Sequence, residues 1–512
     1  MTQFTNLFPK KVSSLLSPRL IVTFALLLII GAGFGIRILD LTDPPLDFHA
    51  WRQLRAAIIT RGKYYSMDTS ADPNIRLKAM ELGAGHGRLE PEIFETLVAI
   101  TYRLIGREEL WIARVYSILF WMIGGIFLYL LSRKLSSMKG ALISLAYYLL
   151  VPFGVIGSRS FLPEPLMIMW ILISTWCLYR WSEHKNWMWT VLLGITGGVA
   201  ILIKVFAVFP IGCAAVAVVL SKWGIKRAVR DPQIWSAAAI MGFIPATYYI
   251  FPSITLGVNY VNVWFFSFSY LLLQPGFYVR WFSVLHDLVN LFPLLASLIG
   301  VTLLKGQGRS LAFGLWLGYW IFGISVPSQI RSHTYYNLVL VPILALPLAP
   351  FGDFILSRLA QLSIRWRLYF IVIGIATLAY PTILTRNELV AKDYRLEVIG
   401  WTKMADILPE GRMIGLTHDY GKRIAYYAWR KVDVWPNIFD FRMQEQGGGS
   451  ADPMDPEWAS VLKRRIESYD YFVVTVISGL EAQPVVESTL FSTYEIYTDE
   501  NGVLIFDLNK KR

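Results

Sequence analysis

The sequence predicts a polytopic α-helical membrane protein with a small α/β domain at its C-terminal end, outside the membrane. The 512 residues are 55% hydrophobic but only 16% charged, whereas a soluble protein of this length has about 25% charged residues. Long apolar runs recur as far as residue 385. Beyond it, short apolar runs alternate with polar segments, as in a small mixed domain.

The apolar runs predict the membrane helices. A crossing needs about 17–25 mostly apolar residues. The first run, from Leu20 to Ile38, is too long for a signal-peptide core and lacks a small-residue cleavage site. We therefore expect it to remain as an anchor. About eleven crossings fit this template, at residues 19–38, 112–131, 140–157, 165–180, 188–203, 205–221, 234–253, 284–304, 310–326, 336–351 and 367–385.

Lysine and arginine residues predict the orientation of these helices. They gather in every second connection, for example at Lys10 and Lys11 before the first span and at Arg133 and Lys134 after the second. Short basic loops stay in the cytoplasm, so the other connections face outward. With an odd number of spans in a cell membrane (inner or plasma), the N-terminus is expected in the cytoplasm and the C-terminal domain outside.

The net charge of +12 belongs to these loops. From Arg386 to the end, acidic residues outnumber basic ones by 20 to 16, so the excess of positive charge lies in the membrane region, where it directs topology. A nucleic-acid partner would require a clustered basic face, and the sequence has none. We expect no nucleic-acid partner.

Two stretches are not membrane spans. The first loop, 39–110, contains "HAWRQLRAAIITRGKYY" and "PEIFETLVAITYRLIG", which predict two amphipathic helices lying along the outer membrane surface. The tail, 386–512, has strand patterns in "MIGLT" and "YFVVTVI", a helix pattern in "DYRLEVIGWTKMADIL", and a hairpin in "YEIYTDENGVLIFDL" that turns at Asn501-Gly502. "QEQGGGSADPMDP" is expected to be a loop. We therefore predict a membrane module, 1–385, and an extracytoplasmic α/β domain, 386–512.

The stretch "DPPLDFHAWRQ", residues 43–53, concentrates polar groups beside a membrane span. A half-apolar setting suits Asp47 to general-base catalysis, although an N-cap of the next helix is an equally good interpretation. Arg52 offers a planar fork for a phosphate, and His49 is a further candidate for binding or shaping the site. Asp43 is interpreted as a turn residue.

Two more carboxylates are candidates. Glu164, between Pro163 and Pro165, is placed at the outer end of a span, where ionisable residues usually face a cavity; a helix-start carboxylate is the alternative. Glu90 is the candidate in "HGRLEPEIFE", whereas its neighbours Glu92 and Glu95 fit a solvated face.

The basic candidates would hold an anionic lipid head group. Lys204 interrupts an apolar run at the membrane edge, where it either binds phosphate or extends its ammonium to water. "SQIRSHTYYNLVLVP" places further polar groups in an outward turn, although tyrosines at membrane interfaces are common without a binding role. These candidates are Arg331, His333, Tyr335 and Tyr336.

An outward Asp in the first long loop resembles the catalytic loop of the GT-C glycosyltransferases, in particular bacterial relatives of the protein O-mannosyltransferases and of the transferases that place aminoarabinose on lipid A. The resemblance rests on the order of several short motifs. They are "PPLDFHAWRQ" at 44–53, "LEP" at 89–91, "REELWIARVYSILF" at 107–120, "SRSFLPEPLMI" at 158–168 and "SHTYYNLVLVP" at 332–342.

The resemblance implies a sugar donor built on a polyprenyl phosphate, transfer on the outer face and inversion at the anomeric carbon. It implies that Asp47 accepts the acceptor's proton, that Glu164 is the second acid, and that Lys204, Arg331 and His333 meet the donor phosphate. One motif departs from the family: the aminoarabinose transferases have Glu-Lys-Pro-Pro in the first loop, whereas this chain has Leu-Glu-Pro-Glu. That departure argues against lipid A as acceptor and leaves a lipid, glycan or protein.

No cofactor is expected. The histidines are scattered, no Asp-x-Asp pair occurs, and Cys177 and Cys213 lie in apolar runs without metal-ligand spacing. Whether a divalent metal takes part is left open. The alternative function is a lipid or polyprenyl-phosphate flippase or transporter, which would have polar groups at mid-span and internal repeats. A structural membrane component that docks a partner would have a less polar first loop.

Overall fold

The computed structural model describes residues 18–86, 90–250, 268–437, 440–441, 452–500 and 502–512. Several expectations lie wholly or partly outside these residues: the basic residues before the first span, the end of the span at 234–253, Leu89 of "LEP", part of the glycine-rich loop, and Asn501 of the hairpin turn. The chain divides into two compact units. The helical unit comprises Met1–Leu41, Leu89–Ile93 and Ala113–Lys392, and the mixed unit comprises Thr42–Arg88, Phe94–Ile112 and Asp393–Arg512.

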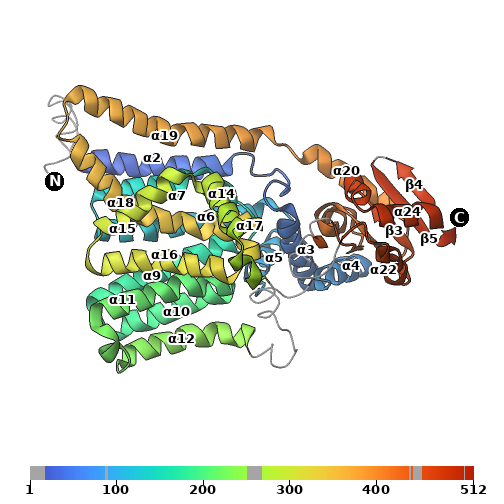
Figure 1. Ribbon diagram of the computed structural model, residues 1–512, viewed down its shortest axis with the longest axis horizontal. Helices are drawn as coiled ribbons and strands as arrows, with labels where there is room; N and C mark the ends of the chain where they lie inside the picture. The colour runs from blue at the N-terminus through green and yellow to red at the C-terminus, as the bar shows by residue number, and fades with distance from the viewer. Residues whose placement is uncertain (1–17, 87–89, 251–267, 438–439, 442–451, 501) are drawn as a thin grey trace. The chain divides into compact units, whose positions relative to one another are not determined.

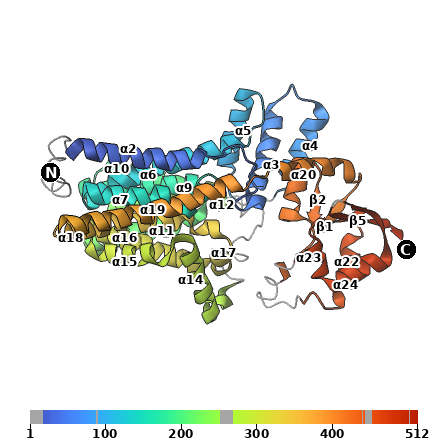
Figure 2. The same cartoon turned by 90° about the horizontal axis from the view of Figure 1, so that it is seen from above.

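In the helical unit, most long helices run nearly parallel to one another, whereas α14 turns away from them (Figures 1 and 2). Every expected span overlaps a helix. The elements are α2 (Pro18–Ile38), α6 (Trp111–Leu135), α7 (Met138–Leu150), α8 (Pro152–Gly157), α9 (Glu164–His184), α10 (Trp187–Ile203), η1 (Val205–Ala207), α11 (Val208–Ala228), α12 (Pro232–Tyr249), η3 (Ser269–Leu273), α14 (Pro275–Val289), α15 (Leu291–Leu303), α16 (Gly306–Ser325), α17 (Pro327–Ser332), η4 (Thr334–Val339), α18 (Leu340–Leu359) and α19 (Ile364–Ala391).

Length and hydropathy mark five helical stretches of the described chain as able to cross a membrane, or six if one bent pair counts as a span. The chain is thus a multi-pass membrane protein, while the expected eleven crossings remain a prediction. The bent pair corrects the span expected at 284–304. There α14 and α15 meet at 95°, because Asn290 has φ 62° and interrupts the helix. The five stretches are Arg19–Ile38, Trp111–Leu135, Val205–Ala228, Thr334–Leu359 and Ile364–Ile407.

Small residues bring α11 and α16 into close contact. A Cβ atom on Gly314 would lie 2.5 Å from Ala214 Cα, and one on Gly318 would lie 2.4 Å from the Phe209 carbonyl oxygen. Helix pairs in membranes pack through such residues because the backbones can then approach closely. The contact holds the C-terminal half of α16 beside the start of α11.

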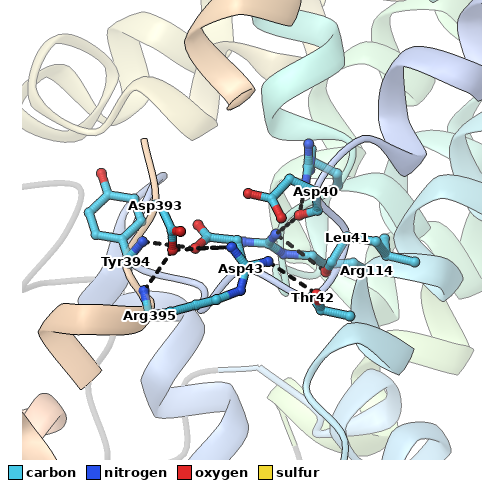
Figure 3. Close-up of polar contacts among 9 residues, drawn as sticks. Asp40, Leu41, Thr42, Asp43, Arg114, Asp393, Tyr394 and Arg395 are labelled. Atoms are coloured by element: carbon cyan, nitrogen blue, oxygen red, sulfur yellow. Dashed lines mark hydrogen bonds and ion pairs between the residues drawn. The ribbon is translucent and has the colours of Figure 1, made fainter. Parts of the chain in front are cut away.

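Three buried arginines fix the end of α2. Arg37, with no exposed surface, donates to Ser158 Oγ at 2.6 Å and to the Leu149 carbonyl oxygen at 2.7 Å. Arg114 and Arg159 donate to the Asp40 carbonyl oxygen at 3.4 and 2.9 Å, the former drawn in Figure 3. These bonds fasten the end of α2 and the turn after it to neighbouring segments, and the bond to Leu149 satisfies a carbonyl oxygen in the last turn of α7.

The mixed unit contains three helices of the first loop and a five-stranded sheet of order β2-β1-β3-β5-β4. β1 is parallel to β2 and β3, and β5 is antiparallel to β3 and β4. The elements are α3 (Ala50–Met67), α4 (Pro73–Ala84), α5 (Ile93–Ile105), α20 (Arg395–Ile407), β1 (Met413–Leu416), η5 (His418–Gly421), η6 (Ile424–Ala428), β2 (Val432–Val434), α22 (Glu457–Ile466), β3 (Tyr471–Val474), α23 (Ile477–Glu481), α24 (Pro484–Thr493), β4 (Tyr494–Glu500) and β5 (Val503–Lys511).

The sheet is covered on both faces because its buried strand residues alternate. Phe472 packs with Leu462 of α22 and Leu490 of α24, whereas Val473 packs with Trp401 of α20 on the other face. The strands at "MIGLT" and "YFVVTVI", the helix over 395–407 and the antiparallel β4–β5 pair confirm the expected elements. Neither α4 nor β2 was expected.

The two expected helices of the first loop differ from each other. α5 is amphipathic as predicted and buries Phe94, Val98 and Tyr102. α3 was expected along a membrane surface, but it is buried on nearly all sides from Arg52 to Gly62. Close packing against α4 accounts for part of this burial. A Cβ atom on Gly62 of α3 would lie only 3.0 Å from the carbonyl oxygen of Ala79 in α4. α3 is therefore a core helix of its unit that carries polar side chains.

Candidate active site

In the helical unit, a buried lysine gathers the two predicted carboxylates. Lys204 stands between α10 and η1 with extended backbone angles, φ −155° and ψ 120°, and is 2% exposed. Its ammonium forms an ion pair with Glu164 at the first turn of α9 and lies 3.4 Å from Glu90 Oε1. This burial excludes the alternative in which Lys204 extends to water.

Aromatic rings form one side of the lysine's environment. The Lys204 ammonium lies 5.1 Å from the ring centre of Tyr335 and 4.6 Å from that of Tyr336, within cation–π range. Tyr336 in turn packs against Phe206 and Phe322, with ring centres 5.3 and 6.0 Å apart. The last two aromatic residues were not predicted from the sequence, where they are part of ordinary apolar runs.

A small pocket opens at this cluster. Glu164, Lys204, Phe206 and Tyr336 line it, and the other lining residues are Met167, Ile171, Ala207, Phe322 and Val339. Within the described chain, Glu164 Oε2 is buried without a hydrogen-bond partner. Apolar walls with a few convergent polar groups are typical of ligand sites.

Of the polar residues predicted in the turn before α18, Tyr336 lines the pocket. His333 accompanies the tyrosines, with ring centres 5.7 Å from Tyr335 and 6.1 Å from Tyr336, and its Nδ1 lies 2.8 Å from Ser332 Oγ. Arg331, in the last turn of α17, has Tyr270 and Arg280 as electrostatic neighbours, and burial lowers the pKa of its guanidinium.

In the mixed unit, Asp47 is held in the turn that precedes α3. Its Oδ1 accepts hydrogen bonds from its neighbour's backbone, Phe48 N at 2.9 Å, and from Gln53 Nε2 at 3.1 Å. The fully buried Gln53 also donates to the Phe48 carbonyl oxygen at 2.7 Å. Asp47 itself is half-buried. Gln53 is therefore a positioning residue, which the sequence showed only as one polar group among several.

The N-cap interpretation of Asp47 is wrong. α3 begins at Ala50, and its N-cap is His49, which has left-handed backbone angles and makes no side-chain cap bond. Arg52, one turn further, is 5% exposed and stacks over the Trp51 ring at 5.7 Å. Asp47 is not the N-cap of α3, so helix capping does not explain why a carboxylate stands at this position.

Asp43 is more than the turn residue it was expected to be. It is 6% exposed and accepts a hydrogen bond from Tyr394 N at 2.8 Å. Arg395 approaches it at 3.8 Å and donates to Thr42 Oγ1 at 3.1 Å. These contacts, drawn in Figure 3, tie the start of the first loop to Tyr394 and to Arg395, the first residue of α20. Asp43 thus connects two segments that are 351 positions apart in the sequence.

A second connection between distant segments is built around Arg61 of α3. Arg61 Nε lies 2.9 Å from Glu108 Oε2, its Nη1 donates to the Tyr426 carbonyl oxygen at 2.6 Å, and it lies 4.2 Å from the Trp429 ring centre. Burial lowers the pKa of Arg61, but Tyr426 and Glu108 outweigh that effect and raise it. Arg61 therefore stays charged. Its hydrogen bond to the Tyr426 carbonyl oxygen connects the first loop to η6.

Replacing Arg61 with Ala is expected to destabilise the mixed unit by about 3–5 kcal/mol, the usual cost of breaking a buried ion pair from one side. The matched control is Arg430→Ala, because Arg430 pairs with Glu410 at 2.5 Å, and that carboxylate is 82% exposed. Its loss should cost no more than about 1 kcal/mol. Thermal unfolding and limited proteolysis of the purified proteins measure the destabilisation caused by each substitution. Equal destabilisation by Arg61→Ala and Arg430→Ala would contradict the prediction.

Metal-ligating side chains are not grouped in the described residues. No set of three His, Cys, Asp or Glu side chains lies close enough to hold an ion there. Cys177 and Cys213 are free thiols.

Comparisons with known proteins agree with this architecture. Residues 90–249, which include Glu90, Glu164 and Lys204, match the family model of the dolichyl-phosphate-mannose-protein mannosyltransferases. No curated protein matches the sequence significantly.

Solved structures match over nearly the whole chain. ArnT from Cupriavidus metallidurans bound to undecaprenyl phosphate superposes with a TM-score of 0.56 at 14% identity, over 94% of this chain and 97% of that one. The Archaeoglobus fulgidus oligosaccharyltransferase tethered with an acceptor peptide containing the NVT sequon gives 0.55 at 13%, over 94% and 73%. At these identities, the similarity establishes the fold. The chain is a multi-pass membrane protein with the fold of the GT-C glycosyltransferase superfamily.

Proposed function

We propose that the protein is an integral-membrane glycosyltransferase that moves a sugar from a polyprenyl-phosphate donor to a lipid, glycan or protein acceptor on the outer face of the membrane. The observation that carries this proposal is the buried Lys204 in an apolar pocket among membrane helices. Burying an ammonium costs free energy that only its ion-pair partners offset, and ionisable residues at membrane depth usually mark substrate sites. The matching fold of ArnT, whose structure holds undecaprenyl phosphate, supports a lipid-phosphate ligand.

The reaction is a displacement at the anomeric carbon. The acceptor's hydroxyl oxygen forms the new bond, the bond from that carbon to the phosphate oxygen breaks, and the polyprenyl phosphate leaves with the electron pair. Asp47 takes the hydroxyl proton as general base, and attack opposite the leaving group inverts the configuration. Gln53 and the Phe48 amide occupy Asp47 Oδ1, which orients the carboxylate for this role.

Lys204 binds the departing phosphate, whose charge needs preorganised donors. Glu164 and Glu90 together with Lys204 carry a formal charge of −1 when both carboxylates are ionised, so the phosphate must displace one of them. Glu164 is the more firmly held partner. We therefore assign Glu164 to orienting Lys204 and expect Glu90 to yield its place to the phosphate.

The remaining predicted residues receive supporting roles. Tyr335 and Tyr336 border Lys204, and His333 lies beside both tyrosines. All three would contact the donor head group. Arg52 and His49 belong to the loop of Asp47 and would bind or shape the substrate there. The positive charge of Arg331 would attract the donor phosphate. The outward orientation of the first loop and of the C-terminal domain is part of the proposal.

Sugar transfer by the purified protein tests the proposed function. A radiolabelled sugar on polyprenyl phosphate is incubated with envelope extract from a strain that lacks the protein, and the glycan and lipid profile of that strain identifies the acceptor. Label should move to an acceptor only when the protein is added. Translocation of the donor across vesicles without transfer would instead establish the flippase alternative.

A further inference from the structure

The mixed unit contains a second cluster of cationic side chains, which the proposed function does not use. Lys422 Nζ lies 3.5 Å from His86 Nδ1. His86 follows α4 in the first loop, whereas Lys422 follows η5 in the C-terminal sheet domain. The other ring nitrogen, His86 Nε2, is buried and has no hydrogen-bond partner among the described residues. A donor or acceptor left in this state is costly, which is an indication of a missing ligand.

A strained turn places Lys422 in this cluster. Asp419, Tyr420 and Gly421 have positive φ angles of 49°, 54° and 77° in succession. Only Gly421 is a residue type that adopts such angles without cost, and a Cβ atom there would lie 2.8 Å from the Val432 carbonyl oxygen. Backbone strain of this kind is retained where the surrounding structure enforces it and is concentrated at functional sites.

The electrostatic surroundings favour an anion. Burial lowers the pKa of Lys422 to about 8, and Arg55 lowers it too, with Asp433 opposing and Lys431 adding to the effect. Burial, followed by Lys422, Arg55 and Lys431, lowers the pKa of His86 to about 3, against a backbone hydrogen bond with Gly85 that raises it. Three cationic groups thus surround a neutral imidazole, with Asp433 as the acidic neighbour, and Asp433 already pairs with Lys431 at 3.0 Å.

We propose that Lys422 and His86 bind an anionic oxygen group, a phosphate or a carboxylate, on the acceptor of the transfer reaction. This assignment of the acceptor class rests on the proposed function. Lys422 donates a charge-assisted hydrogen bond to the anion, and the ring nitrogen of His86 without a partner donates a second. Because Lys422 stays largely protonated below pH 8, the site is ready for an anion at neutral pH.

Binding by the full-length protein in detergent tests the site without any sugar transfer. Inorganic phosphate is titrated calorimetrically at pH 7 into wild type, Lys422→Met, Lys422→Arg and Lys463→Met. Lys463 is exposed on α22, so its variant removes the same charge elsewhere. Lys422→Met should bind phosphate about tenfold more weakly, as for the loss of one charge-assisted hydrogen bond, while the other two variants bind like wild type. Absent binding, or equal weakening by Lys463→Met, overturns the site.

A second titration distinguishes acceptor from donor. Polyprenyl phosphate without sugar replaces inorganic phosphate as the probe, and Lys422→Met should bind it as well as wild type does. A tenfold loss would assign the cluster to the donor and overturn the acceptor assignment. If the protein transfers no sugar at all, the proposed function fails, but the phosphate titration still decides whether the site exists.

Discussion

Replacing Asp47 with Asn is expected to lower the turnover number for sugar transfer by about 10²–10⁴-fold, the usual contribution of general acid–base catalysis. Asn keeps an Oδ1 atom that can accept from Phe48 N and Gln53 Nε2, so the loop geometry should survive. Only the basic oxygen is lost. Initial rates at saturating donor, normalised to folded protein, measure the effect.

The control for Asp47 is Asp68→Asn, which makes the same charge change in the same unit at the C-terminal end of α3. This variant should transfer sugar at the wild-type rate. Thermal unfolding of both variants should stay close to that of wild type, because Asp47 caps no helix. If Asp47→Asn retained its turnover within about twofold, a loss too small for general-base catalysis, Asp47 would not be the base.

Replacing Lys204 with Met is expected to raise the KM for the polyprenyl-phosphate donor by about 10–100-fold, since a hydrogen bond to a charged group contributes about 1.5–3 kcal/mol. The same change leaves Glu164 buried without its partner, which should destabilise the protein by about 3–5 kcal/mol. Steady-state kinetics over a range of donor concentrations and thermal unfolding measure the two effects.

A double variant separates binding from folding. Glu164→Gln combined with Lys204→Met removes both charges, so most of the lost stability should return, while the donor KM should stay high. The matched control is Lys185→Met, because Lys185 pairs with Asp231 at the other end of α10. Recovery of normal donor binding by the double variant would show that Lys204 has only a structural role.

Several candidate site residues were recognisable because local sequence patterns carry the information. Lys204 interrupts an apolar run, Glu164 stands between two prolines, and Asp47 follows a Pro-Pro pair beside a membrane span. Each pattern marked an ionisable group where hydrocarbon makes it costly. The patterns did not decide between roles, and the structure did so for Lys204, which is 2% exposed and so does not extend to water.

Other residues were invisible for a physical reason. Gln53 matters because its amide reaches Asp47 and the Phe48 carbonyl oxygen at once, a geometry that depends on how the chain turns into α3. Lys422 matters because a strained turn brings it to His86, 336 positions away. Neither the composition nor the periodicity of the sequence shows that two residues so far apart will be in contact.

The sequence by itself determined the helices of the membrane region, the mixed character of the tail and the candidate ionisable groups. Hydropathy and side-chain periodicity are local properties, because each residue's burial follows from its own helix or strand face. Only the tertiary structure decided the partners: Lys204 with Glu164, 40 positions away, and Arg61 with Tyr426, 365 positions away. Ion pairs and hydrogen bonds have a reach of only a few ångströms, so the folded chain has to bring such residues together before they can interact.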